Sequence, residues 1–135
     1  MKILIIDAQG GGLGKQLITN IKKDFQGAFI TAVGTNSIAT AAMLKAGADE
    51  AATGENSVIT ACRSADIIIG PIGIVIADAM IGEITAEMAA AVARSNAKRI
   101  LIPFSNCDNY IAGVADQSTG RLITDAIKQL KSLMK

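Results

Sequence analysis

Short apolar runs alternate with amphipathic segments along the chain. The first run, residues 2–6, is apolar after its opening lysine and shows no polar alternation, which is typical of a strand buried on both faces. In the segment that follows, Leu13, Leu17, Ile21 and Phe25 recur at every fourth position. This spacing places the apolar side chains on one face and predicts an amphipathic α-helix.

The same alternation continues along the rest of the chain. Further strands are predicted at residues 28–33, 49–52, 66–69, 99–104 and 110–114. Helices are predicted from Asn36 or Ser37 to Gly47, over 56–63, from Thr85 onward and over 122–134. Residues 72–81, I-G-I-V-I-A-D-A-M-I, fit a helix or a strand, and Gly82 as a stop favours a helix. Together the elements predict one α/β domain, residues 1–135, with a doubly wound, mostly parallel sheet of five or six strands and helices on both faces.

Composition and charge narrow the classes of function. The net charge is +1, without a basic block or stacking aromatic residues, so nucleic acid is not an expected partner. Every apolar run is well below the ~20 residues that span a bilayer, and no membrane association is expected. The N-terminus leads into a strand pattern rather than a signal peptide, and we expect a cytoplasmic protein.

The chain contains no histidine and two cysteines. This composition excludes a Cys/His zinc site, a histidine-based triad and a histidine general base, and no metal site is predicted. Cys62 falls late in a predicted helix and is expected in the core, whereas Cys107 lies in a polar loop beside Asp108. With no histidine to depress its pKa, Cys107 is expected to be accessible but ordinary. The isolated acids Asp78 and Glu83 are interpreted as solvated surface residues.

Small and polar residues gather directly after the predicted strands. The sequences that follow the first five strands are Q-G-G-G-L-G, G-T-N-S, T-G-E-N, G-P-I-G and S-N-C-D-N. In a parallel sheet these turns all lie at the carboxyl edge, where open α/β proteins bind their ligands. Turns at the opposite edge, such as D-F-Q-G-A, look like plain connections. The difference predicts a ligand site at the carboxyl edge.

The first of these turns is the strongest candidate. Glycine lets a ligand approach the backbone, and the free N–H groups at a helix start favour an anion. The candidate phosphate-binding residues are Gly10, Gly11, Gly12, Leu13, Gly14 and Lys15. The alternative is a tight strand-to-helix turn in which Gly14 allows close packing, which explains two glycines well and four poorly.

The glycine-rich turn matches no standard phosphate-binding pattern in full. The dinucleotide pattern G-x-G-x-x-G fails because position 15 is lysine, and the short-chain dehydrogenase turn T-G-x-x-x-G-x-G has Ala8 at its first glycine. The phosphate-loop pattern G-x-x-x-x-G-K-[ST] has Gln9 at its first glycine and Gln16 at the magnesium-binding hydroxyl. The missing hydroxyl argues against hydrolysis of a magnesium-bound nucleotide.

Three other turns supply the remaining candidate cofactor-binding residues. After the second strand, an NAD site usually carries an acid. This chain has Thr35, Asn36 and Ser37 instead, which favours NADP or a mononucleotide, and the candidate binding residues of this turn are Gly34, Thr35 and Asn36. The alternative is that Asn36 or Ser37 only caps the next helix. The rest of the cleft is assigned to Thr53, Gly54 and Glu55 and to Gly70, Pro71, Ile72 and Gly73. Their alternatives are a helix cap and a rigid turn.

Six stretches together resemble a family of small bacterial proteins, found in clostridia-like anaerobes and known as a domain of unknown function. They are D7-A-Q-G-G-G-L-G-K15, G34-T-N-S-I-A-T40, M43-L-K-A-G-A48, T53-G-E-N56, I69-G-P-I-G-I74 and I100-L-I-P103. The resemblance runs over nearly the whole chain and includes a cysteine that matches Cys107. It implies a compact Rossmann-like fold and supplies no reaction, substrate or assigned site.

We therefore expect a small nucleotide- or dinucleotide-binding protein that takes a phosphate-bearing ligand at the glycine-rich turn. The expected cofactor is NADP, NAD or another nucleotide, and one form of this function is an oxidoreductase linked to a redox cofactor. The alternatives are a non-catalytic ligand-sensing or assembly subunit and, least favoured, a divergent phosphate-loop protein. No acid–base pair is recognisable, which favours the non-catalytic alternative.

The apolar segment 74–81 raises the question of assembly. As a helix it would be apolar nearly all round, and such a helix must be buried by something. We expect a homo-oligomer whose interface includes this segment, from Ile74 to Ile81. The alternative is burial of the segment inside the monomer.

Overall fold

The computed structural model describes residues 1–103, 109–114 and 117–134. Its strands are β1 (Lys2–Asp7), β2 (Phe29–Gly34), β3 (Glu50–Thr53), β4 (Ile67–Pro71) and β5 (Lys98–Ile102). Its helices are α1 (Gly12–Asp24), α2 (Ser37–Lys45), α3 (Glu55–Cys62), α4 (Ala86–Arg94) and α5 (Thr119–Leu133), with a short 3₁₀ helix, η1 (Ile72–Val75), after β4. None of these helices is long and apolar enough to cross a membrane.

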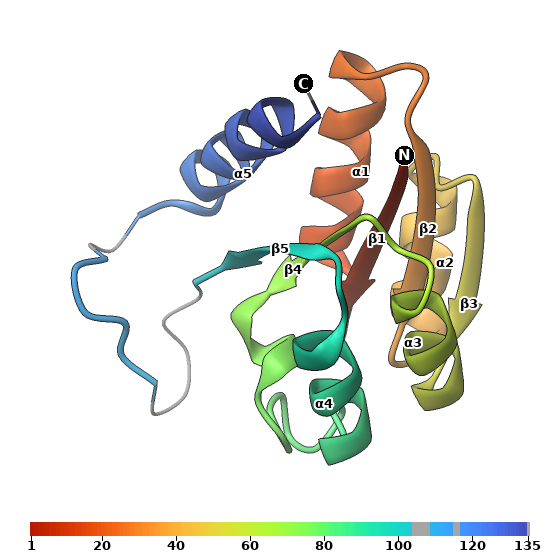
Figure 1. Cartoon of the computed structure of the whole chain (residues 1–135), viewed down its shortest axis with the longest axis vertical. Helices are drawn as coiled ribbons and strands as arrows, with labels where there is room; N and C mark the ends of the chain where they lie inside the picture. Colours follow the sequence, from red (N-terminus) through yellow and green to blue (C-terminus); the bar gives the residue numbers. More distant parts are fainter. Residues whose placement is uncertain (104–108, 115–116, 135) are drawn as a thin grey trace.

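The strands form one parallel sheet in the order β3-β2-β1-β4-β5 (Figure 1). β1 lies at the centre and pairs with β2 on one side and with β4 on the other. Its last residue, Asp7, is level with Gly34 at the end of β2. The direction in which the chain adds strands reverses between β1 and β4, and this is the topological switch point of the fold. The predicted doubly wound α/β fold is confirmed.

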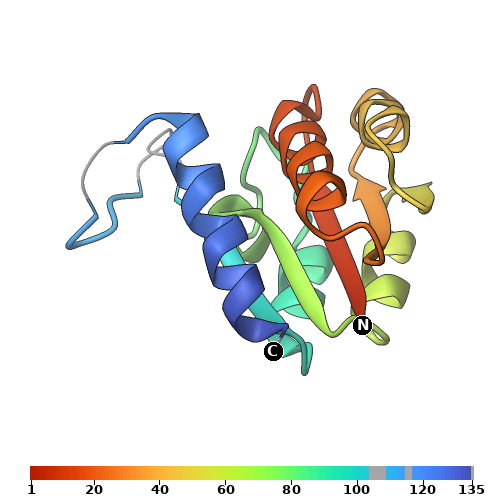
Figure 2. The ribbon, with the colours of Figure 1, turned by 90° about the horizontal axis from the view of Figure 1, so that it is seen from above.

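Side chains of β1 pack on both faces of the sheet, which explains why its apolar run is continuous. Ile3 and Ile5 point to a core covered by α1, α2 and α5. Leu4 and Ile6 point to a second core covered by α3 and α4. Figure 2 shows α1 and α5 on the same face of the sheet. Because the helices cover both faces, the carboxyl edge of the sheet is left for a ligand site.

Two of the predicted elements are wrong. Residues 110–114 form no strand, and of residues 72–81 only η1 is helical. The chain after η1 forms turns, with positive φ at Asp78, Met80, Ile81 and Gly82, so it cannot continue as a right-handed helix. In residues 72–81 almost every position is apolar, so hydrophobic periodicity cannot distinguish a helix from a strand or from turns. β5 ends before position 104, and Phe104 lies outside the described residues.

The apolar segment after β4 is anchored inside the monomer. Ile74 and Ile84 are buried in the core on the α3–α4 face, and Val75, Ala79 and Met80 pack against it. Most of the apolar side chains of this segment are therefore buried within the monomer, as the alternative interpretation proposed. The premise that an apolar helix needs a second copy as cover no longer holds.

Cys62 is buried at the end of α3, and burial raises the pKa of its thiol to about 11. A buried thiol that stays protonated is a poor nucleophile. Cys107 lies outside the described residues, so its accessibility stays a prediction.

In a Cys107→Ser variant, Cys62 is the only thiol, and we expect a thiol reagent to modify it slowly at about pH 8 because the reaction must wait for opening of the fold. Addition of urea should make the reaction fast. The Cys62→Ala variant, which retains Cys107, is the matched control. A fast reaction of Cys62 without urea would contradict its burial.

Candidate functional site

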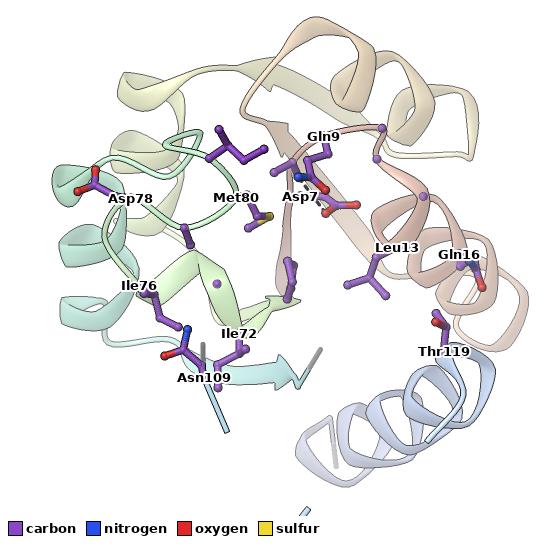
Figure 3. A pocket seen from close by; sticks show the side chains of 18 of the residues that line it. Asp7, Gln9, Leu13, Gln16, Ile72, Ile76, Asp78, Met80, Asn109 and Thr119 are labelled. Atoms are coloured by element: carbon purple, nitrogen blue, oxygen red, sulfur yellow. Dashed lines mark hydrogen bonds between the residues drawn. The ribbon is translucent and has the colours of Figure 1, made fainter. Parts of the chain in front are cut away.

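A cavity of about 580 Å³ opens at the carboxyl edge of the sheet (Figure 3). We define the glycine loop as residues 8–14. One wall of the cavity is formed by residues 8–13 of this loop and by Gln16 on α1. The opposite wall is the turn from Pro71 to Gly73 with residues 76–81. Asn109 and Thr119 also line the cavity, at the side of Ile72 and the start of α5. The cavity therefore lies at the switch point between β1 and β4.

Asp7, at the end of β1, organises the glycine loop. Its Oδ1 accepts a hydrogen bond from the Ala8 N–H at 2.8 Å, and its Oδ2 accepts one from the Gly14 N–H at 2.7 Å. Only 5% of the residue is exposed. Burial raises the pKa of the Asp7 carboxyl above its ordinary value, although the two N–H groups oppose the shift.

This arrangement corrects the predicted phosphate site. The Gly14 N–H is occupied by Asp7, and the Gly11 N–H donates to the Ala8 carbonyl at 3.0 Å. Neither group is available to a ligand. Within the described part of the chain, the N–H groups of Gly10 and Gly12 have no hydrogen-bond acceptor. The Leu13 N–H is directed at the Asp7 carboxyl and helps to lower its pKa, so an anion site at this loop is reduced to the N–H groups of Gly10 and Gly12.

The glycines of the loop divide into two pairs. Gly11 has φ +76°, and a Cβ there would lie 2.8 Å from the Ala39 Cα; a Cβ at Gly14 would lie 2.5 Å from the Met43 Sδ. The fold therefore requires both. Gly10 and Gly12 have no positive φ, and a Cβ at either would meet no atom within 4 Å. Tight turning and close packing explain two of the four glycines, and the unexplained two line the cavity.

Glu83 joins three segments that are far apart in the sequence. Its Oε1 accepts hydrogen bonds from the Gln9 N–H at 2.9 Å, the Thr35 Oγ1 at 2.6 Å and the Asn36 Nδ2 at 2.9 Å. We name these four residues the Glu83 cluster. Burial works against ionisation of the carboxyl, but the donated hydrogen bonds outweigh it and lower the pKa of Glu83. The interpretation of Glu83 as a solvated surface acid is wrong.

The turn after β2 is used by the protein itself. Asn36 caps α2, because its Oδ1 accepts from the Ala39 N–H at 2.9 Å, as the alternative interpretation proposed. Its Nδ2 and the Thr35 hydroxyl are both directed to Glu83. Neither residue lines the cavity, and Gly34 packs closely against Thr40. The side-chain donors that were predicted to bind a sugar are therefore already hydrogen-bonded within the protein.

The turn after β3 also lies away from the cavity. Gly54 has φ +101° and starts α3. The Thr53 hydroxyl is hydrogen-bonded to the Thr40 hydroxyl, and Glu55 accepts from the Thr85 hydroxyl, which caps α4. Thr53 thus connects β3 to α2, and Glu55 connects α3 to the start of α4.

Two further candidates from the sequence do not reach the cavity. Lys15 is exposed on α1, and Gly70 is buried in β4, where a Cβ would lie 2.5 Å from the Ile6 carbonyl oxygen. The predicted residues that do line the cavity are Gly10, Gly11, Gly12, Leu13, Pro71, Ile72 and Gly73.

The 76–84 loop, which the sequence did not reveal as part of the site, has a strained backbone. Asp78, Met80 and Ile81 have φ between 57° and 65°, although none is glycine. The left-handed region costs such residues roughly 1–2 kcal/mol each. The Asp78 N–H donates to the Ile84 carbonyl at 2.7 Å, and buried Ile84 holds the loop end. Backbone strain that the surroundings maintain is typical of ligand sites.

Other lining residues were missed for different reasons. Gln16 stands one turn into α1, and Thr119 opens α5, which starts at the carboxyl edge like every helix that follows a parallel strand. Parallel topology alone could have drawn attention to Thr119. Cys107 and Asp108 lie outside the described residues. Among the lining residues that the structure describes, two are aspartates and none is lysine or arginine.

A family model described as "Domain of unknown function (DUF3842)" matches residues 2–135. The chain belongs to this family. No curated protein matches the chain. Among solved structures, a dodecameric FMN-dependent Ubix-like decarboxylase from Escherichia coli O157:H7 is 16% identical, with a TM-score of 0.49 over 97% of this chain and 76% of that chain. This similarity is too low to transfer a ligand, a reaction or an assembly to the DUF3842 chain.

Glu83→Gln keeps one oxygen for the three donors but removes the charge, so we expect it to lower the free energy of unfolding by about 1 kcal/mol near pH 7. The folded pKa of Glu83 lies below its ordinary value of 4.5, so its stabilisation is complete above that value and is lost as the pH falls through the folded pKa. Urea unfolding of both proteins at about pH 7 and about pH 3.5 measures the difference. A difference that does not shrink on acidification would contradict the hydrogen-bonded, ionised Glu83.

Proposed function

We propose that this protein binds a small nucleotide-type ligand in the cavity between the glycine loop and the turn from Pro71 to Gly73. The ligand's phosphate lies against the N–H groups of Gly10 and Gly12. The observation that carries this proposal is that both residues line the cavity while the fold requires neither to be glycine. A residue without a side chain is useful at such a position when a ligand must approach the backbone.

The size and the walls of the cavity support the proposal. Its volume of about 580 Å³ falls within the range of roughly 300–1,000 Å³ that is usual for small-molecule sites. Leu13, Ile72, Ile76 and Met80 offer an apolar surface for a planar ring (Figure 3). Gln9 and Asn109 offer amide groups that can hydrogen-bond its edge.

The charge of the site sets a condition on phosphate binding. Asp7 lines the same cavity, and its carboxylate repels a phosphate on Gly12. Burial already raises the pKa of Asp7, and a bound phosphate raises it further. Protonation of Asp7 relieves the repulsion, so a phosphate-bearing ligand binds more tightly as the pH falls towards the pKa of Asp7.

The site favours binding over catalysis. Asp7 is the buried titratable group in the described lining, and both of its oxygens accept backbone hydrogen bonds. It therefore positions the loop rather than acting as a general acid or base on a ligand. A ligand-sensing or assembly subunit is accordingly the form of nucleotide binding that we favour over an oxidoreductase.

Self-association through the segment 74–81 stays a prediction. The apolar surface that this segment exposes is smaller than the sequence suggested, because most of its side chains pack inside the monomer. Of the large apolar side chains of this segment, Ile81 is the one that is 97% exposed. Sedimentation velocity of the wild-type protein and of an Ile81→Glu variant would test it. A wild-type monomer at about micromolar concentration would contradict assembly.

Gly12→Val places a side chain in open space in the first turn of α1, so we expect the helix and the free energy of unfolding to be kept within about 0.5 kcal/mol. Nucleotide binding should fall at least about tenfold because the side chain occupies the phosphate position. The probes are AMP, GMP, flavin mononucleotide and coenzyme A, and the readouts are thermal shift and calorimetric titration.

Gly120→Val is the matched control. It makes the same change in the first turn of α5, where a Cβ also meets nothing within 4 Å, but Gly120 does not line the cavity. Binding that survives Gly12→Val, or that Gly120→Val weakens equally, would refute the assigned phosphate position. A wild-type protein that binds none of the nucleotides would refute the function.

A further inference from the structure

We propose that Glu83 closes the β2 end of the ligand site and so restricts it to mononucleotides, excluding dinucleotides such as NAD, NADP and flavin adenine dinucleotide. This inference rests on the proposed function and narrows its class of ligand.

The reason lies in where a dinucleotide reaches on this fold. In doubly wound sheets a dinucleotide lies across the switch point, with the ribose of one nucleoside at the end of β2. The side chains at that place here are Thr35 and Asn36. Both donate their hydrogen bonds to the Glu83 Oε1, at 2.6 Å and 2.9 Å. Because Glu83 reaches the β2 turn from the 76–84 loop, on the opposite wall of the cavity, its side chain stands across the path that a dinucleotide would take.

Gln9 completes the barrier between the end of β2 and the cavity. Its N–H donates to Glu83, and its carbonyl accepts from the Asn36 Nδ2 at 2.9 Å. Its φ of +53° is uncommon for a residue with a side chain and is maintained by these contacts. Gln9 lines the cavity, whereas Glu83, Thr35 and Asn36 do not. The Glu83 cluster therefore links the glycine loop, the 76–84 loop and the β2 turn. Gln9 stands between the cavity and the other three residues of the cluster.

The remaining space runs in the opposite direction. From the glycine loop the cavity extends past Ile72 to Asn109 and to Thr119 at the start of α5 (Figure 3). This direction leads away from β2, so the lining residues offer a place for a base on the β4 side and none at the end of β2. A ligand whose phosphate lies at Gly12 can therefore place its base only on the β4 side of β1.

Charge strengthens the exclusion for NADP. The three donated hydrogen bonds lower the pKa of Glu83, which therefore carries a negative charge at neutral pH. A 2′-phosphate at the end of β2 would lie against this carboxylate, and like charges at such a place repel. The lean towards NADP that the absence of an acid after β2 suggested is thereby reversed, because the acid arrives from the 76–84 loop.

Two matched pairs of probes test the restriction, because the members of each pair differ by one nucleotide unit. They are flavin mononucleotide with flavin adenine dinucleotide, and AMP with NAD; NADP is titrated beside NAD. We expect calorimetric titration of the wild-type protein to show at least about tenfold tighter binding of a mononucleotide than of its dinucleotide partner. Equal or tighter binding of the dinucleotides would overturn the restriction and leave the proposed function standing. No binding of any probe would overturn both.

Variants assign the restriction to Glu83. Glu83→Ala removes the acceptor of all three hydrogen bonds, and we expect it to reduce the mononucleotide preference to below about threefold. Glu83→Gln keeps the acceptor and should keep the preference against NAD while weakening the exclusion of NADP. Glu55→Ala is the control, since Glu55 also accepts from a threonine hydroxyl but lies away from the cavity. If Glu83→Ala folds and keeps the full preference for mononucleotides, the assignment to Glu83 is overturned. If Glu83→Ala does not fold, the wild-type titrations and the Glu83→Gln variant test the proposal.

Discussion

The carboxylate of Asp7 is the contact on which the ligand site depends. It stands where the central strand ends and the first helix begins, and it accepts the Ala8 and Gly14 N–H groups. A negative charge at a helix start is stabilising by roughly 0.3–1 kcal/mol, and by more when it is partly buried. Without it, two buried donors would lose their acceptors, at a cost of about 1–3 kcal/mol each. Asp7 thereby fixes the path of the glycine loop and, through it, one wall of the cavity.

The same contact limits what the site can do. Because Asp7 uses the helix start, a ligand finds the peripheral N–H groups of Gly10 and Gly12 rather than a full helix N-terminus. Glu83 places a second carboxylate beside the start of the glycine loop, where it accepts the Gln9 N–H. Asp7 thus occupies the helix start that dinucleotide-binding proteins leave to the pyrophosphate of their ligand. Glu83 ties the 76–84 loop to the β2 turn across the site. The ligand site is therefore shorter than a dinucleotide site. It lies at the switch point, between the backbone of the glycine loop and the apolar side chains of the opposite wall.

The order of strands and helices could be predicted from the sequence because apolar runs and helical periodicity are local signals. The glycine loop and the turn from Pro71 to Gly73 could be placed at the site, since parallel strands bring their ends to one edge. The 76–84 loop could not, because its left-handed residues include Ile81, a residue type that rarely adopts positive φ. Glu83 acts over a separation of 74 positions from Gln9, and no local pattern records such a contact.

The position of the ligand is the central claim, and amide chemical-shift changes on titration with AMP and flavin mononucleotide test it most directly. We predict the largest shifts at Gly10, Gly12 and Gly73, with Gly34 and Gly54 unchanged. Shifts gathered instead around Ser57 and Thr60, which line a separate groove between β3 and α3, would contradict the account. So would saturable binding that leaves the Gly10 and Gly12 amides unmoved.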